Sequence, residues 1–210
     1  MKAALDLRLM VITDVALAAP RTVEAVIDAA VRAGAPAVQL RDKQATAGAL
    51  LAQARRLIVI VRSTGALLFI NDRIDVAIAA GADGVHLGPA DVPVAAARRI
   101  APPHFLIGYS TDDPALASAA EAAGATYIGC GSVFGTTTKE TGGERVGVAR
   151  VRAVVDAVGI PVIGIGGVTR ENAGAVMAAG AAGVAVVGAV MGAPDPARAT
   201  TDLLLALLRS

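Results

Sequence analysis

The chain of 210 residues is long enough for one domain with a substantial core. Nineteen basic against 18 acidic residues leave a net charge of +1 without a basic stripe, so the sequence does not indicate nucleic-acid binding. The single cysteine, Cys130, excludes an intrachain disulfide, and no apolar stretch approaches the roughly 20 residues of a membrane span. We therefore expect one domain over residues 1–210, in a cytoplasmic protein without nucleic-acid or membrane partners.

Apolar strands and amphipathic helices alternate along the chain, separated by glycine, proline and helix-capping residues. We expect strands at 7–13, 37–40, 66–70, 84–87, 105–109, 126–129, 160–167 and 183–187, the seventh of which ends in a glycine turn at 166–167. We expect helices at 23–33, 47–62, 74–80, 93–100, from the cap residues 110–113 through 123, at 150–158, 172–179 and 203–208. A weak Gly-Ala repeat precedes three strands, at 81–85, 124–128 and 180–184. The pattern predicts an α/β fold of eight β/α units and favours a closed (β/α)8 barrel over an open sheet.

Polar or glycine-rich clusters follow seven of the expected strands. In a barrel of this kind the functional side chains follow the carboxyl ends of the strands, at one mouth. The clusters lie at 39–43, 71–72, 91, 110, 136–139, 166–167 and 188. We therefore expect one mouth to collect all of them.

Asp72 and Asp91 each follow the carboxyl end of a strand, and the two strands belong to neighbouring β/α units. If these strands pair at roughly 4.8 Å, both carboxylates reach the same rim. Mg²⁺ typically uses one or two carboxylates together with substrate phosphates, so the pair predicts a magnesium site. The alternative for either residue is a carboxylate placed at a helix N-terminus, where the helix dipole favours it.

Several segments offer donors for phosphate. Gly166-Gly167 and Val187-Gly188 follow the last two strands, where barrels commonly bind phosphate through backbone N–H groups. Hydroxyls and a cation lie at 136–139, and a basic pair lies in the loop after the second strand, at Arg41 and Lys43. The alternatives are tight glycine turns, a solvated threonine loop and an ordinary exposed basic pair.

The two histidines and the cysteine do not form a catalytic constellation with any other residue. His86 precedes the end of its strand and is expected to pack there, and His104 is expected on the surface. Cys130 lies between two glycines and is expected to be a small buried residue. No nucleophile with an adjacent base can be identified from the sequence.

Taken as a set and in this order, these motifs resemble those of the thiamine-phosphate synthase family, and the similarity covers nearly the whole chain. The matching segments are 39–43, 70–73, 84–88 with Asp91, 136–139 and 165–168. The resemblance implies a single TIM barrel that joins 4-amino-2-methyl-5-hydroxymethylpyrimidine diphosphate to a thiazole monophosphate, giving thiamine phosphate and pyrophosphate. It also implies Mg²⁺ as cofactor and small-molecule substrates as partners, and it leaves a homo-oligomer open.

The resemblance also implies roles for individual residues. The implied metal ligands are Asp72 and Asp91. The implied catalytic residues are Arg41, Lys43, Ser110 and Lys139. The implied substrate-binding residues are Gln39, Arg41, Lys43, Asn71, Ser110, Thr136, Thr137, Thr138, Lys139, Gly167, Val187 and Gly188. Gly188 departs from the pattern, because the family commonly has serine there.

Two other functions stay open at this point. A thiazole tautomerase on the same barrel would need a proton-transferring residue near the loop after the sixth strand, and residues 131–134 contain no histidine. A non-catalytic binder of phosphate ligands would have less need of the two aspartates and Lys139. The sequence therefore favours a synthase that works by Mg-assisted dissociative displacement, with no protein nucleophile.

Overall fold

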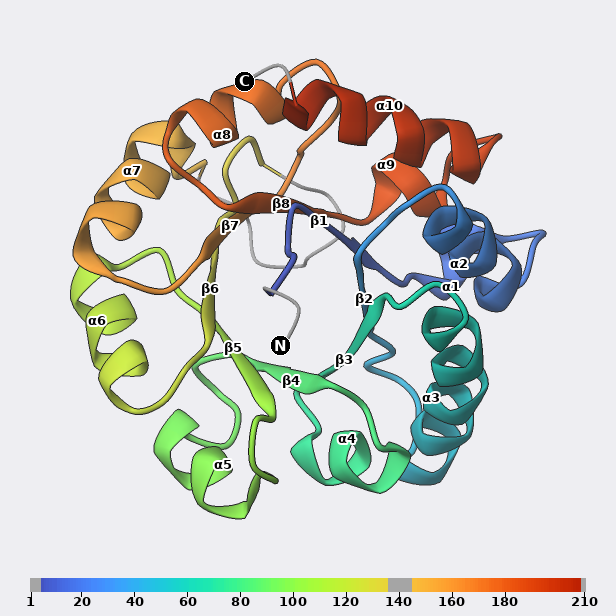
Figure 1. Cartoon of the computed structure of the whole chain (residues 1–210), viewed down its shortest axis with the longest axis horizontal. Coiled ribbons are helices and arrows are strands. Elements are labelled where there is room, and N and C mark those ends of the chain that lie inside the picture. The colour runs from blue at the N-terminus through green and yellow to red at the C-terminus, as the bar shows by residue number, and fades with distance from the viewer. Residues whose placement is uncertain (1–4, 136–144, 209–210) are drawn as a thin grey trace.

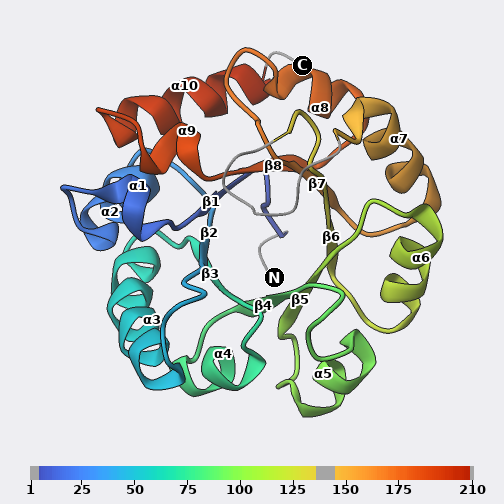
Figure 2. The same cartoon turned by 180° about the vertical axis from the view of Figure 1, so that it is seen from behind.

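The computed structural model describes residues 5–135 and 145–208, and in these residues a ring of helices surrounds a closed barrel of parallel strands (Figure 1). The strands pair in sequence order, and β8 pairs with β1 to close the barrel. Figure 2 shows the same ring from behind, again with helices outside the strands. The strands are β1 (Leu9–Ile12), β2 (Ala37–Leu40), β3 (Leu67–Asn71), β4 (Gly84–Leu87), β5 (Leu106–Ser110), β6 (Tyr127–Cys130), β7 (Val162–Ile165) and β8 (Gly183–Val186).

Capping side chains set the start of several helices. Asp14, Thr22, Thr46 and Asp113 each accept a hydrogen bond from a backbone N–H in the first turn of the helix that follows. In the described part of the chain, no helix has both the length and the apolar character needed to cross a membrane. The helices are α1 (Val15–Ala18), α2 (Val23–Arg32), α3 (Ala47–Arg62), α4 (Ile74–Ala80), α5 (Val94–Ile100), α6 (Pro114–Ala122), α7 (Gly147–Ala157), α8 (Ala173–Ala178), α9 (Gly188–Met191) and α10 (Pro196–Leu208).

The core has two layers because successive side chains of a strand point to opposite faces of the sheet. The outward-facing side chains, such as Val38 and Ile107, pack with the helices. The inward-facing side chains fill the barrel with a smaller cluster, formed by Leu7, Met10, Ile12, Ala37, Phe69, Tyr127, Ile163 and Ala185. Residues two positions further along these strands face the same interior, nearer the carboxyl ends.

The closed barrel confirms the fold predicted from the sequence, with differences at element ends. The eighth strand was expected over 183–187, but β8 ends at Val186, and Gly188, expected to follow the strand in a loop, begins the short helix α9. Pro93 occupies the N-cap of α5 instead of its first turn, and α7 begins at Gly147 instead of Arg150. Helices α1 and α9 are four residues each, too short to produce the apolar periodicity that predicts a helix.

Candidate active site at the barrel mouth

The inward-facing positions at the carboxyl ends of β2, β3 and β5 carry three of the polar residues predicted for the site. Gln39 lies two residues after the interior residue Ala37, and Asn71 lies two residues after Phe69. Ser110 lies four residues after Leu106 on β5, so its side chain is on the same face of the strand as Leu106, which packs against the interior cluster. Strand alternation thus brings these side chains together above the apolar interior.

Hydrogen bonds hold the chain where it leaves β2. The Thr13 N–H donates to the carbonyl of Gln39 (2.9 Å), and the Arg41 N–H donates to the Thr13 hydroxyl (2.9 Å). The Gln39 side chain is buried, and its amide nitrogen donates to the Met10 sulfur at 3.6 Å. A thioether is a weak acceptor, so a ligand that offers a better acceptor would bind Gln39 more strongly. Sequence reasoning did not identify Thr13 as part of this arrangement.

Asp42 organises the next part of the loop. One carboxylate oxygen accepts from the N–H groups of Gln44 and Ala45, both at 3.1 Å. The other accepts from the side-chain amide of Gln53 on α3 at 3.0 Å. Asp42 therefore links the loop that carries Arg41 and Lys43 to helix α3.

The two aspartates predicted as metal ligands lie together. The Asp91 carboxyl is within hydrogen-bonding reach of Asp72, and the Lys43 ammonium lies 3.5 Å from the Asp72 carboxylate. Burial, and after it the neighbouring Asp91 carboxyl, raises the pKa of Asp72, while Lys43 opposes this shift. Asp72 has a φ of 63°, and its N–H donates to the carbonyl of His86 at 2.8 Å. Asp91 accepts from the Gly88 N–H at 2.6 Å.

Neither acid caps a helix through a side-chain hydrogen bond. The N-cap of α4 is Arg73 and that of α5 is Pro93, and neither helix has a side-chain cap bond. Within residues 5–135 and 145–208, no group of three or more His, Cys, Asp or Glu side chains could hold a metal ion. A pair of carboxylates still suits Mg²⁺, which completes its shell with phosphate oxygens and water.

Ser110 belongs to a hydrogen-bonded chain that sequence reasoning missed. Its hydroxyl lies 2.7 Å from Nε2 of His86, and Nδ1 of His86 lies 2.9 Å from the Tyr127 hydroxyl. His86 is buried, as expected, but it contacts a predicted site residue. Burial raises the pKa of Tyr127 well above its ordinary value and that of Cys130 to about 12. Both therefore stay protonated at neutral pH, and Cys130 is not poised as a nucleophile.

The mouth beside β6 and β7 is made mostly of backbone. Gly166 and Gly167 have φ values of 99° and 66°, as the tight-turn interpretation required. The Phe134 N–H donates to the carbonyl of Gly166 at 2.9 Å, and a Cβ on Gly167 would overlap the carbonyl oxygen of Gly135. Among the described residues the Ser132 hydroxyl is buried without a hydrogen-bond partner, and it lies against Gly166. The turn thus brings backbone groups close to the mouth.

The remaining predicted phosphate ligands differ in how far they can be placed. Val187 lies two residues after Ala185, whose side chain faces the barrel interior, so Val187 falls on the same face of the strand. Gly188 is exposed at the start of α9. A Cβ on Gly188 would have Leu17 as its nearest contact, at 3.9 Å, so a side chain could be accommodated. The predicted residues outside the described part of the chain are Thr136, Thr137, Thr138 and Lys139.

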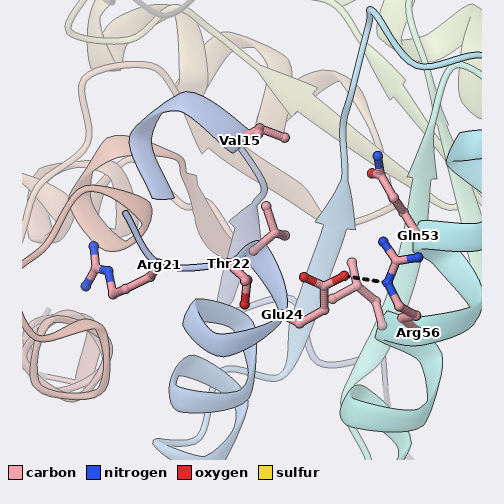
Figure 3. Close-up of a pocket in the computed structure, with 8 residues that line it drawn as sticks. Val15, Arg21, Thr22, Glu24, Gln53 and Arg56 are labelled. Atoms are coloured by element: carbon pink, nitrogen blue, oxygen red, sulfur yellow. Dashed lines mark hydrogen bonds and ion pairs between the residues drawn. The ribbon is translucent and has the colours of Figure 1, made fainter. Parts of the chain in front are cut away.

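Two cavities lie away from these residues. One, of about 250 Å³, is a groove outside the barrel between α2 and α3, where Glu24 and Arg56 form an ion pair at 2.7 Å (Figure 3). The other, of about 630 Å³, lies at the amino ends of the strands and is lined by Pro36 and Leu67, among others. The amino-terminal face of such barrels contributes to stability, whereas activity belongs to the opposite face. Neither cavity therefore displaces the mouth as the candidate site.

Comparisons with known proteins cover almost the whole chain. The family model for thiamine monophosphate synthase matches residues 9–190. A thiamine-phosphate synthase from Roseiflexus castenholzii is 45% identical over 193 residues, which cover 92% of this chain and 85% of the relative. One from Methanoregula boonei is 44% identical over 197 residues, covering 94% and 91%. The structure of a thiamine phosphate pyrophosphorylase from Pyrococcus furiosus matches with a TM-score of 0.89 at 40% identity, covering 97% of this chain and 96% of that one.

Proposed function

The chain belongs to the thiamine monophosphate synthase family, and from this premise we propose how its barrel mouth carries out the reaction. The enzyme is a transferase that couples a pyrimidine diphosphate to a thiazole monophosphate, giving thiamine phosphate and pyrophosphate. We propose that the pyrimidine substrate is the 4-amino-2-methyl-5-hydroxymethyl compound. We also propose that the reaction takes place in the cytoplasm, in one domain of residues 1–210.

The observation that carries the proposal is that the Asp91 carboxyl lies close enough to Asp72 to raise its pKa, while the Lys43 ammonium lies 3.5 Å from the Asp72 carboxylate. Burial and the neighbouring Asp91 carboxyl raise the pKa of Asp72, so keeping Asp72 ionised is costly in the free protein, and a divalent cation bound between the two carboxyls would offset that cost. In the proposal Asp72 and Asp91 hold Mg²⁺. When bound, the ion would neutralise charge on the diphosphate and on the leaving pyrophosphate.

The pyrimidine diphosphate lies across the β2–β5 side of the mouth in this proposal. Arg41, Lys43 and Lys139 bind the diphosphate oxygens, because cations there stabilise the charge that grows on the leaving group. Ser110 donates a hydrogen bond to the same group. The amides of Gln39 and Asn71 are placed nearer the barrel axis, where donors and acceptors suit the aminopyrimidine.

Coupling proceeds by dissociative displacement. The bond between the pyrimidine methylene carbon and the diphosphate oxygen breaks, its electron pair leaves with pyrophosphate, and the aminopyrimidine delocalises the resulting methylene cation. The thiazole nitrogen then forms the new bond from a position already held beside it. This step needs no protein nucleophile, which agrees with the buried, protonated Cys130.

The thiazole monophosphate occupies the opposite side of the mouth. Its phosphate accepts hydrogen bonds from the backbone N–H groups of the turn at Gly167 and of Val187 and Gly188. Glycine suits these positions because it lets the backbone approach an anion closely. Hydroxyl donors come from Thr136, Thr137 and Thr138. The thiazole tautomerase alternative is less well supported, because residues 131–135 offer no side chain that transfers protons at neutral pH.

A coupling assay tests this proposal. Purified protein is incubated with both substrates and Mg²⁺, and thiamine phosphate and pyrophosphate are quantified with and without a chelator. The expected result is equimolar formation of both products, which the chelator abolishes. A folded protein that binds both substrates but forms neither product would support the non-catalytic binder instead.

A further inference from the structure

Tyr127, His86 and Ser110 form a polar chain across three strands beneath the mouth. In the strand register, His86 on β4 is level with Gly108 on β5, and Gly108 is level with Tyr127 on β6. A Cβ on Gly108 would overlap both the Tyr127 ring and the His86 imidazole. The glycine therefore lets side chains from two non-adjacent strands meet over the strand between them.

The direction of the hydrogen bonds follows from the Tyr127 hydroxyl. Among the described residues, its hydrogen-bond partner is Nδ1 of His86 alone, at 2.9 Å. A buried phenol with a single partner must donate its hydrogen to that partner, because an unsatisfied buried O–H group is costly. Nδ1 of His86 is then the acceptor, so the neutral imidazole carries its proton on Nε2.

The proton on Nε2 determines the orientation of the serine. Nε2 lies 2.7 Å from the Ser110 oxygen and donates to it, so the serine hydrogen points elsewhere. In the described part of the chain, no acceptor takes that hydrogen, and Ser110 lies at the open carboxyl end of β5. A phosphate oxygen, which accepts hydrogen bonds but has none to donate when ionised, matches this group.

We propose that Tyr127 is a positioning residue that acts through His86 to hold the Ser110 hydroxyl as a hydrogen-bond donor to the diphosphate of the substrate. The inference deepens the proposed function and rests on it for the identity of the ligand. Without the Tyr127 hydroxyl, His86 could carry its proton on Nδ1 and accept the serine hydrogen on Nε2. The serine would then present its lone pairs to the anion.

Nitrogen NMR of the ¹⁵N-histidine-labelled protein tests the proton position without relying on activity. The chain has two histidines, and the His104→Gln variant assigns the signals of His86. In the unsubstituted protein at neutral pH, we expect a neutral His86 with its proton on Nε2, and in Tyr127→Phe a shift toward the Nδ1–H form. A proton on Nδ1, or a doubly protonated ring, in the unsubstituted protein would overturn the inference even if the coupling reaction is confirmed.

Kinetics test the link to the substrate, with Tyr109→Phe as the matched control because Tyr109 packs with the outer core. Tyr127→Phe should raise KM for the pyrimidine diphosphate by about 3- to 10-fold, which is the loss of affinity expected when one hydrogen bond to the substrate is removed. In a Ser110→Ala background the same substitution should change KM by less than about twofold. Independent, additive effects would show that Tyr127 only supports the fold and would overturn the positioning role.

Discussion

The two sides of the barrel mouth are built from different chemical groups. On the β2–β5 side, charged and polar side chains converge, with the carboxyl of Asp91 near enough to raise the pKa of Asp72 and with Lys43 beside Asp72. On the described part of the β6–β8 side, backbone dominates, with the glycines at 166 and 167 in left-handed conformations. The first side can hold a metal and a diphosphate through charge, whereas the second can hold a phosphate through N–H groups. Substitutions should therefore act through charge on one side and through backbone geometry on the other.

The largest expected effect comes from removing charge at the carboxylate pair. Asp72→Asn keeps the size of the side chain but removes one proposed metal ligand, so kcat should fall by about a thousandfold, or about 4 kcal/mol in the barrier. Steady-state kinetics with saturating substrates and Mg²⁺ provide the measurement. The control is Asp75→Asn, since Asp75 is exposed and pairs with Arg73. If both variants kept near-normal kcat, the carboxylate pair would have no part in catalysis.

Backbone geometry on the opposite side is tested by Gly167→Ala. The new Cβ would overlap the carbonyl of Gly135, so KM for the thiazole monophosphate should rise by about 10-fold, and KM for the pyrimidine diphosphate should stay unchanged. Gly65→Ala is the control, because Gly65 has a similar φ of 77° but open space around it. It should lose about 1 kcal/mol of stability without a change in KM. Equal effects on both KM values would contradict the division of the mouth.

The carboxylate pair should also destabilise the free protein. Burial and Asp91 raise the pKa of Asp72 in the folded state, so folding is favoured less once the pH rises above that pKa. Asp91→Asn removes the repulsion and keeps an acceptor for the Gly88 N–H, so at pH 7.5 in EDTA it should raise Tm by about 2–4 °C. The gain should shrink as the pH falls through the pKa of Asp72, where that carboxyl becomes neutral. An unchanged or lower Tm at pH 7.5 would argue against the repulsion.

The smallest expected effect concerns Gly188, where the family commonly has serine. Because a Cβ there has its nearest contact at 3.9 Å, Gly188→Ser should fold normally and lower KM for the thiazole monophosphate by about 2- to 5-fold through a new hydroxyl donor. Gly188→Ala separates the hydroxyl from the added bulk and should leave KM unchanged. An equal change in both variants would mean that the hydroxyl does not reach the phosphate.

The carboxylate side of the mouth could be predicted from the sequence because it depends only on which residues follow two consecutive strands. Asp72 and Asp91 each follow a strand, and β3 and β4 are adjacent, so strand order alone placed the two acids together. Gln39 and Asn71 also belong to clusters that follow strands, but their roles came from the family resemblance, and the structure shows that each follows an interior residue by two positions.

The polar chain beneath the mouth could not be predicted in this way. His86 and Tyr127 are 41 residues apart on strands that do not pair with each other, and their contact depends on the register of β4, β5 and β6 and on the glycine between them. Before the register was known, a buried strand histidine indicated only packing. A glycine in the middle of β5 and another in β6 were the signals that side chains from neighbouring strands need room there.

The division of the mouth is tested most directly by a crystal structure of the protein with Mn²⁺, as an anomalous substitute for Mg²⁺, and pyrophosphate. The account predicts an anomalous peak for a Mn²⁺ ion that is bound by one carboxylate oxygen from Asp72 and one from Asp91, with metal–oxygen distances of about 2.0–2.3 Å. Pyrophosphate should contact that ion on the β2–β5 side, near Lys43 and Ser110. A peak that involves neither aspartate, or pyrophosphate bound only at the glycine turn, would contradict the account.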